Sequence, residues 1–390
     1  MRVYLDHAAT SPMPIVVRDA YMRALELVGN PASTHGHGQT ASDLLEEARA
    51  SVAGTLGCDP AMVTFTGGGT ESINLALKGM FWAVQRTSVG ERRVVLIAEG
   101  EHHATLEAAE WLRDAQGATL EFIPINAHGM VTPEALTETI ERVGAERIAV
   151  CSFLWANNEV GTISSVTELV RVARDAGVPV HVDAVAALGQ VEIDFASLGA
   201  DALSLSAHKI GGPVGVGALL LSRTATIDSL LHGGTQQRAR SGTQNVAGAV
   251  AFAAALAEAY GPGFADRMRH LAEQRDAFVS EVLATTPGAV LRGSRESRLP
   301  GNAHFTFEGC QGDSLVFLLD QRGISASVGS ACQAGVAEVS HVLLAMGLPE
   351  ATARGSLRFT FHHDTTADDV QRVLDALPDA VMRARAAGLS

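Results

Sequence analysis

Short apolar runs alternate with amphipathic stretches through the first two thirds of the chain. The apolar runs have the length of strands and lie at 62–65, 94–97, 148–153, 178–182, 202–205 and 217–221. Between them lie stretches such as 167–176, whose apolar positions recur with the period of a helix. Strands that are apolar along their whole length are typical of parallel sheets covered by helices on both faces. The pattern therefore predicts an α/β fold built on a mostly parallel sheet.

The pattern changes near residue 260. An Ala-rich stretch at 246–259 predicts a helix, and the sequence Tyr-Gly-Pro-Gly that follows it breaks the helical periodicity. The remainder has the pattern of a smaller α/β unit. We therefore expect a large domain at 15–260 and a small C-terminal domain at 261–390, with an N-terminal segment at 1–14 that packs with the small domain.

Composition narrows the classes of function. The chain has 390 residues, of which 47% are hydrophobic and 39 are glycine, and these values are typical of a folded globular protein. Its formal net charge of −14 argues against direct binding of nucleic acid, because phosphate binding depends on clustered cations. We find no signal-peptide pattern at the start and no apolar run long enough to span a bilayer. We therefore expect a cytoplasmic location and no membrane partner.

The four cysteines are widely scattered, and their spacing predicts neither a disulfide framework nor a zinc ribbon. Cys332 lies in a segment of small residues, 325–335, that we expect to be mobile and exposed to solvent, so it is a candidate nucleophile. Cys151 lies in an apolar run and is expected to be an inert core residue. Cys58 and Cys310 lie beside turn residues without an obvious partner.

Lysine is rare in this chain. Only Lys78 and Lys209 occur, against 27 arginines. A lysine amine can lose its proton and form a Schiff base with a carbonyl group, whereas a guanidinium group stays protonated. Lys209 lies among small residues at 206–212, where a cofactor can approach the backbone closely. Its alternative reading is an ordinary surface cation, and Lys78 is interpreted as a solvated cation at the end of a helix.

Two further features point to a phosphorylated ligand with a basic ring. The sequence Thr-Gly-Gly-Gly-Thr-Glu-Ser at 66–72 follows an expected strand and opens an expected helix, so its backbone amides can hold a phosphate. The alternative is a plain tight turn. Asp183 ends another expected strand, where α/β sheets bind their ligands, and can pair with a ring nitrogen. The alternative there is a helix-capping aspartate.

Three other positions can contact such a ligand. His102 follows a strand and can stack on an aromatic ring or transfer protons. A metal site at His102 and His103 is less favoured, because neighbouring histidines rarely bind one ion together and no third ligand is evident. The stretch 157–159 supplies polar groups or forms a turn. Arg358 is either a clamp for a substrate carboxylate or an ordinary exposed strand residue. Together these groups supply what pyridoxal phosphate needs.

The chain closely resembles the cysteine desulfurases, a family of pyridoxal-phosphate enzymes within the class V aminotransferase fold. The matching motifs, in family order, are at 4–10 (YLDHAAT), 30–33 (NPAS), 65–74, 101–103 (EHH), 157–161 (NNEVG), 181–183 (HVD), 206–209 (SAHK), 240–243 (RSGT) and 329–332 (GSAC). They extend over nearly the whole sequence. The resemblance implies the type I fold of pyridoxal-phosphate-dependent transferases, with a mainly parallel seven-stranded sheet in the large domain and a smaller α/β domain that carries the catalytic-cysteine loop in its long form.

The resemblance also implies a role for each matching residue. Lys209 would bind the cofactor covalently, Asp183 would pair with its pyridine nitrogen, and His102 would stack on its ring. Cys332 would accept the sulfur. The remaining implied ligands are Gly69, Thr70, Ser206 and His208 at the phosphate, Thr243 at the phosphate from the neighbouring subunit of a homodimer, and Asn158 and Arg358 at the substrate carboxylate or the ring oxygen of the cofactor.

The implied reaction converts L-cysteine to L-alanine and leaves a persulfide on the enzyme for transfer to an acceptor protein. Selenocysteine lyase and class V aminotransferase activities use the same cofactor apparatus and stay open. One departure from the family pattern is Ala186, which stands where the family usually has a glutamine that contacts the cofactor's phenolic oxygen. This departure keeps open a non-enzymatic sulfur-assembly scaffold with a decayed site. The acceptor pathway, whether iron–sulfur cluster assembly, tRNA thiolation or another, is not predicted by the sequence.

Overall fold

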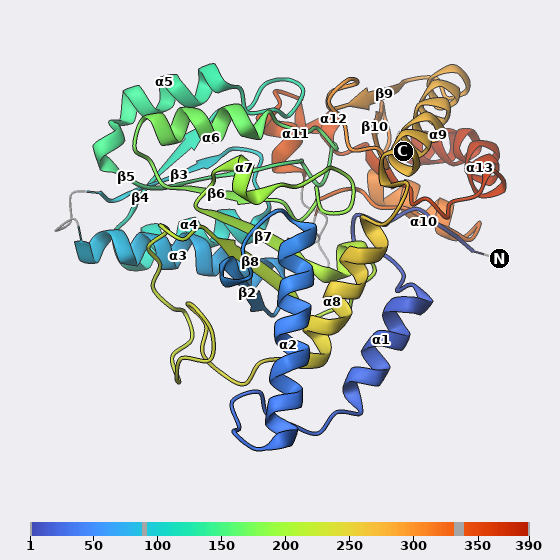
Figure 1. Ribbon diagram of the computed structural model, residues 1–390. Helices are drawn as coiled ribbons and strands as arrows, with labels where there is room; N and C mark the ends of the chain where they lie inside the picture. Colours follow the sequence, from blue (N-terminus) through green and yellow to red (C-terminus); the bar gives the residue numbers. More distant parts are fainter. Residues whose placement is uncertain (1, 88–91, 331–338, 389–390) are drawn as a thin grey trace.

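The protein folds around a seven-stranded sheet covered by helices on both faces, with a smaller unit packed at one side (Figure 1). The structure, a computed structural model, describes residues 2–87, 92–330 and 339–388. Helices α5 and α6 lie on one face of the sheet and α3 and α4 on the other, while α1, α2 and α8 project below the body in the view of Figure 1. The predicted α/β fold is confirmed.

The strand order of the large sheet is β2-β8-β7-β6-β5-β3-β4. Its strands are β2 (Val63–Thr66), β3 (Val94–Ala98), β4 (Thr119–Ile123), β5 (Ile148–Leu154), β6 (Val180–Asp183), β7 (Ala202–Ser206) and β8 (Gly217–Leu221). All neighbours pair in parallel except β8, which is antiparallel to both β7 and β2. The six apolar runs of the sequence correspond to six of these strands. The missed strand, β4, lies at the edge of the sheet and is only partly buried, so it lacks a continuous apolar run.

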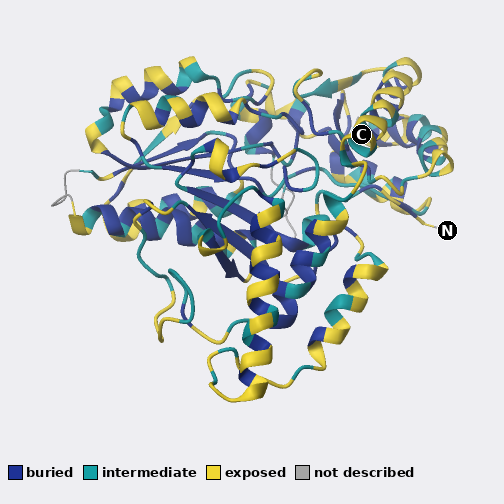
Figure 2. Ribbon diagram, viewed as in Figure 1, coloured by how far each residue is buried: buried dark blue, intermediate teal, exposed yellow. Residues whose placement is uncertain are grey.

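Both faces of the sheet are buried because successive side chains point in opposite directions. In β3, Val94, Leu96 and Ala98 pack into one core, whereas Val95 and Ile97 pack into the core on the opposite face. Figure 2 shows the resulting layer of buried residues along the sheet, with exposed residues on the outer sides of the helices. The chain's apolar runs are therefore explained by burial on both faces.

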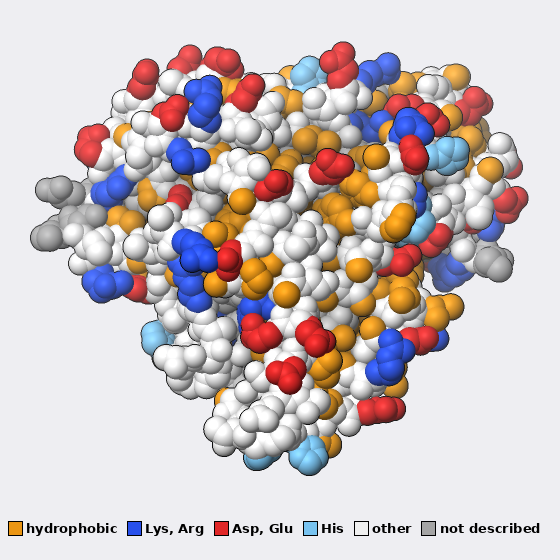
Figure 3. Space-filling view, in the orientation of Figure 1, with side chains coloured by type: hydrophobic (Ala, Val, Ile, Leu, Met, Phe, Trp, Pro, Cys, Tyr) orange, Lys and Arg blue, Asp and Glu red, His pale blue; other side chains and the backbone are white. Residues whose placement is uncertain are grey.

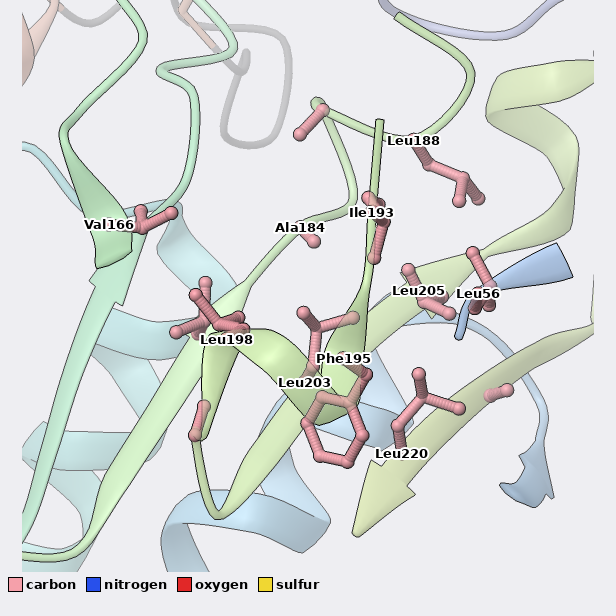
Figure 4. Packing of buried hydrophobic residues seen from close by; sticks show 14 of the residues in the cluster. Leu56, Val166, Ala184, Leu188, Ile193, Phe195, Leu198, Leu203, Leu205 and Leu220 are labelled. Atoms are coloured by element: carbon pink, nitrogen blue, oxygen red, sulfur yellow. The ribbon is translucent and has the colours of Figure 1, made fainter. Parts of the chain in front are cut away.

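The helices that pack on or beside the sheet range from 4 to 20 residues in length. They are α2 (Gly36–Thr55), α3 (Gly69–Thr87), α4 (His103–Gln116), α5 (Pro133–Val143), α6 (Val166–Asp175), α7 (Phe195–Leu198) and α8 (Val246–Ala259), with short 3-10 helices at Pro60–Met62, Ala145–Arg147 and Ala207–Ile210. Figure 4 shows part of the core, where Phe195 of α7 lies beside Leu203 and Leu220 of the sheet. Full burial of one such side chain contributes about 1.5–3 kcal/mol. Helix α1 (Ile15–Leu25) packs on α8 through Val17, Ala251 and Ala255.

The smaller unit has a core of its own. Its antiparallel sheet consists of β9 (Ala289–Arg292), β10 (Asn302–Phe307) and β12 (Ser356–Thr360), and its helices are α9 (Phe264–Thr285), α10 (Gly312–Asp320), α11 (His341–Ala345), α12 (Glu350–Ala353) and α13 (Ala367–Gly388). The ring of Phe278 meets those of Phe305, Phe359 and Phe361 edge to face at 5.1–6.2 Å. Such aromatic pairs add to the stabilisation that their buried area gives.

The N-terminal segment is tied to this smaller unit. Strand β1 (Val3–Tyr4) pairs in parallel with β11 (Ile324–Ser325), and Val3 and Leu5 belong to the core that contains the phenylalanine cluster. The next residues of the chain cross to the carboxyl edge of the large sheet. The segment therefore connects the small unit's core to that edge.

Lys78 is not at a helix end, so that prediction was wrong. Helix α3 continues for nine residues beyond it, to Thr87, and the Lys78 amine lies 4.3 Å from the centre of the Trp111 ring. Gly79 does not break the helix. It lets residue 228 approach, since a Cβ on Gly79 would lie 2.4 Å from the Asp228 carbonyl oxygen. The glycine thus serves close packing within the helix.

Two other predictions concern single features. Cys151 is buried in β5, as predicted for an inert core residue, and burial raises the pKa of its thiol.

Among the described residues no single helix is long and apolar enough to cross a membrane, although α8 and α9, which meet at 71°, pass that test of length and composition as a pair.

Candidate active site

A cavity of about 270 Å³ opens at the carboxyl edge of the large sheet. Strands β2, β3, β5, β6 and β7 all end there, because strands that run in the same direction bring their carboxyl ends to one edge. The wall of the cavity contains most of the predicted cofactor residues: Gly69, Thr70, His102, Asn158, Asp183, Ser206, His208 and Lys209. The fold thus gathers residues that are up to 140 positions apart in the sequence.

The glycine-rich turn after β2 is packed tightly against its surroundings. A Cβ on Gly69 would lie 2.8 Å from a methyl group of Val185, and Gly68 has a φ of +142°, which side chains disfavour. The turn is closed by the carboxylate of Glu71, which accepts a hydrogen bond of 2.7 Å from the Gly67 amide. Helix α3 starts at Gly69, so its free amides and the positive end of its dipole face the cavity beside Thr70.

Asp183 is the last residue of β6. The register places it opposite Leu154 of β5 and Ser204 of β7, and its side chain is only 2% exposed. One carboxylate oxygen accepts a hydrogen bond of 2.9 Å from the Val185 amide. Burial raises the pKa of Asp183 to about 6, against the opposing effects of that hydrogen bond and of the Lys209 charge. A buried carboxylate of this kind is stabilised by a cationic partner in the cavity.

Lys209 follows β7 within the short 3-10 helix Ala207–Ile210. Its amine donates hydrogen bonds to the carbonyl oxygens of Ala8 at 2.5 Å and Ala9 at 3.1 Å, so the N-terminal segment reaches the site. Burial and, to a smaller extent, the charge of Arg358 lower the pKa of Lys209 to about 8, although the charges of Asp183 and Asp6 oppose the shift. The lowered pKa makes the uncharged, nucleophilic form of the amine accessible near neutral pH.

His102 is held in one orientation. It caps the N-terminus of α4, where its Nδ1 accepts a hydrogen bond of 3.0 Å from the Ala104 amide. Burial lowers the pKa of His102 to about 4, and the nearby Lys209, His103 and His341 add to this effect. The imidazole is therefore neutral at pH 7 with its proton on Nε2, and a neutral ring is suited to stacking on a flat ligand.

Arg358 lies beside the cavity without forming part of its wall. The side chain is buried on β12 and donates hydrogen bonds of 2.7 Å to the Asn158 carbonyl oxygen and 2.9 Å to the Asp6 carboxylate. Arg358 is therefore not the exposed strand residue of the alternative reading. A substrate carboxylate would take the place that the Asp6 carboxylate holds on the guanidinium group.

Two predicted residues remain. Thr243 is exposed and does not line this cavity. Cys332, with the surrounding residues 331–338, lies outside the described residues, so the structure does not test its predicted position or exposure.

The sequence motifs assigned no role to several other residues of the wall. The small unit and the N-terminal segment contribute Asn302, Thr360 and His7. Gln190 also lines the cavity, with its side-chain oxygen bound to the Gly301 amide at 3.1 Å. No local pattern marks these residues, because they reach the cavity only through packing of the small unit on the large sheet. Ala186 lines the wall too, so its methyl group leaves that position without an amide.

Comparison with known proteins assigns the family. Residues 3–373 match the family described as Aminotransferase class-V. An IscS-like cysteine desulfurase of Mycobacterium tuberculosis is 47% identical over 389 residues, which cover 99% of this chain and 98% of the relative. The chain belongs to the cysteine desulfurases of the class V aminotransferase family. The resemblance found in the motifs is thereby confirmed, and with it the dependence on pyridoxal phosphate that this family shares.

Further relatives and solved structures agree with this assignment. The cysteine desulfurase IscS of Dictyoglomus turgidum is 37% identical and the match covers 98% of this chain and 95% of the relative. A solved structure titled NifS-like protein is 33% identical with a TM-score of 0.89, over 98% of this chain and 100% of that one. A NifS-like protein from Rickettsia africae is 26% identical with a TM-score of 0.85, over 97% and 99% of the two chains.

The residues present fit pyridoxal phosphate. Its phosphate suits the α3 N-terminus with Thr70, Ser206 and His208, and its ring nitrogen suits the buried carboxylate of Asp183, to which no cationic side chain of the described residues is bound. Its aldehyde suits the lowered pKa of Lys209, and its flat ring suits the neutral imidazole of His102. The cavity therefore contains a chemical partner for each end of the cofactor.

The lowered pKa of Lys209 gives a testable pH dependence. Only the uncharged amine attacks an aldehyde, and with a pKa near 8 about one tenth of the amines are uncharged at pH 7, against about one in three thousand at the ordinary value. We expect the rate at which cofactor-free protein binds pyridoxal phosphate covalently to rise up to about pH 8 and then level off. Stopped-flow absorbance measures this rate, with Lys209→Arg as the control that cannot form the bond. A rate that still climbs at pH 10 would contradict the shift.

Proposed function

We propose that this protein converts L-cysteine to L-alanine, transfers the substrate sulfur to Cys332 as a persulfide, and passes it on to an acceptor protein. The observation that carries the proposal is the pairing, in one cavity, of an amine of lowered pKa at Lys209 with the buried carboxylate of Asp183. The family assignment supports the same reaction.

Different residues of the site have different roles in the first step, the removal of the substrate Cα proton. Bound pyridoxal phosphate withdraws electrons from the substrate Cα and so makes its proton acidic. Asp183 stabilises the proton on the ring nitrogen, which keeps the ring electron-poor. Arg358 and the neighbouring Asn158 orient the substrate carboxylate, and the Lys209 amine, once released from the cofactor, accepts the Cα proton at Nζ.

The sulfur step needs a thiolate and no external oxidant. The Cys332 thiolate attacks the substrate sulfur, so that a sulfur–sulfur bond forms and the carbon–sulfur bond of the substrate breaks. The electron pair of the broken bond stays with the carbon fragment, which takes up protons and leaves as alanine. Sulfur is thus moved in a form that an acceptor thiol can remove from Cys332 by exchange.

Replacement of Cys332 tests the proposal. We expect Cys332→Ala to retain the cofactor absorbance and to lose at least 100-fold of the sulfide released from L-cysteine in the presence of a reducing thiol, because the carbon–sulfur bond has lost its nucleophile. Alanine and sulfide formation are measured together, with L-selenocysteine and a 2-oxo acid as comparison substrates.

Two outcomes would contradict the proposal. Full sulfide release by Cys332→Ala would exclude Cys332 as the sulfur acceptor. A wild-type protein that turns over the 2-oxo acid with an amino donor, or selenocysteine alone, and leaves cysteine unchanged would assign one of the alternative activities instead.

We also propose that the protein is a homodimer in which Thr243 contacts the cofactor phosphate of the neighbouring subunit. Thr243 is exposed and lies outside the wall of its own cavity, which is consistent with a role in trans. Helix α1 and the residues after it expose large apolar side chains, namely Ile15, Met22, Leu25 and Val28, each more than half exposed. Figure 3 shows hydrophobic surface in the region of α1. A patch of this kind suits a protein interface.

Mixed dimers test the role of Thr243. A dimer of one Thr243→Ala chain and one Lys209→Ala chain contains two kinds of cavity, and a role in trans gives the cavity with Lys209 an intact neighbouring Thr243 and places both defects in the other cavity. We therefore expect such hybrids to bind cofactor at their Lys209 cavity as tightly as hybrids of wild-type and Lys209→Ala chains, whereas homodimers of Thr243→Ala should bind it more weakly. Weaker binding at the Lys209 cavity of the first hybrid, or sedimentation at the mass of a single chain, would contradict the proposal.

A further inference from the structure

Two fully buried carboxyl side chains, Glu101 and Glu159, lie beside the cavity and take no part in the mechanism above. Glu159 is 3% exposed and Glu101 is 1% exposed. Each directly adjoins a residue of the cavity wall, since Glu101 precedes His102 and Glu159 follows Asn158. Burial of an acidic side chain is costly unless its surroundings bind it, so these two positions call for a structural or functional reason.

The backbone around Glu159 is fixed by side-chain amides. The Asn157 carboxamide oxygen accepts hydrogen bonds from the amides of Glu159 at 2.9 Å and Val160 at 3.0 Å. The Asn302 side chain of the small unit donates a hydrogen bond of 3.1 Å to the Glu159 carbonyl oxygen. The Glu159 carboxyl group therefore projects from a turn that has little freedom to move.

That carboxyl group binds the start of α11. The Ser340 hydroxyl donates a hydrogen bond to Oε2 of Glu159, and the same hydroxyl oxygen accepts one of 3.1 Å from the Leu343 amide as the N-cap of α11. The next residue, His341, donates from Nε2 to the Glu101 carbonyl oxygen at 2.8 Å, and its ring meets that of His103 edge to face at 4.9 Å. Ser340 is 2% exposed, so water does not compete for these bonds.

These contacts lie where the described chain resumes after the segment that contains the sulfur acceptor Cys332. Cys332 precedes Ser340 by eight residues. On the other side of Cys332, the Arg358 amide donates a hydrogen bond of 2.6 Å to the Ser327 carbonyl oxygen, and the Ser356 hydroxyl donates one of 3.0 Å to the Val328 carbonyl oxygen. The chain on both sides of the segment is thus bound to residues that adjoin or form the substrate site.

We propose that Ser340 and Glu159 are positioning residues for the sulfur-transfer step. Through their hydrogen bond they hold the chain from Ser340 onward at a fixed place relative to Asn158 and the cavity, without contact with the reacting atoms. The inference rests on the proposed function, because it concerns delivery of the Cys332 thiolate. It assigns the two residues to the transfer of sulfur and not to cofactor binding or to the earlier proton transfer.

The test separates the two stages of one turnover. The change of cofactor absorbance on rapid mixing with L-cysteine reports the chemistry in the cavity, and alkylation of quenched samples followed by mass spectrometry reports persulfide on Cys332. For Ser340→Ala in the cofactor-loaded full chain, we expect persulfide to form at least tenfold more slowly, while the rate of the absorbance change and its dependence on cysteine concentration stay within about twofold of wild type.

Matched variants exclude a purely structural role. Thr132→Ala removes the same kind of N-cap hydrogen bond from α5, at 3.2 Å from the Ala135 amide, and should change neither stage. Ser340→Thr keeps the hydroxyl and Glu159→Gln keeps an acceptor for it, so both should form persulfide at close to the wild-type rate. Glu159→Leu combined with Ser340→Ala should be no slower than the slower single variant, because both changes remove one interaction.

Three results would overturn the inference. The first is persulfide formation by Ser340→Ala within twofold of wild type. The second is an equal loss in both stages, and the third is multiplication of the single effects in the double variant. Wild-type protein that forms no persulfide on Cys332 would refute the proposed function, which is a different failure and removes the basis of the inference as well.

Discussion

The burial of Asp183 and Lys209 in one cavity at the edge of the sheet is the constraint on which the site depends. Each group shifts the pKa of the other toward its charged form, while burial shifts both toward neutrality. The pKa of the Lys209 amine therefore lies close to neutral pH. The Asp183 carboxylate, which burial destabilises, would be stabilised by a bound cation. A charged aromatic cofactor that offers both an aldehyde and a ring nitrogen meets both demands at once.

The sheet brings Asp183 and Lys209 into one cavity, and contacts from the N-terminal segment and the small unit complete the site. Strands β6 and β7 bring Asp183 and the segment of Lys209 to the same edge. The N-terminal segment then crosses from the phenylalanine core of the small unit to this edge. There the carbonyl oxygens of Ala8 and Ala9 bind the Lys209 amine, and the Asp6 carboxylate binds Arg358.

Much of this arrangement could be predicted from the sequence. Six strands are buried on both faces and so appear as continuous apolar runs, and the glycine turn, Asp183 and Lys209 each follow such a run. The edge strand β4 was missed because it is only partly buried and Thr119 and Glu121 interrupt its apolar run. Lys78 was misplaced because the helix continues for nine residues beyond it, to Thr87. Contacts between the two units, such as those of His7, Asn302 and Ser340, have no local pattern, since they arise when distant segments pack together.

Reduction with borohydride tests the central claim most directly. Borohydride fixes pyridoxal phosphate irreversibly to any lysine that holds it as an imine, and peptide mapping by mass spectrometry then identifies that lysine. We predict that the reduced cofactor is found on Lys209 and that the protein loses its visible absorbance on reduction. Modification of Lys78, or a colourless protein that borohydride leaves unmodified after incubation with excess cofactor, would contradict it.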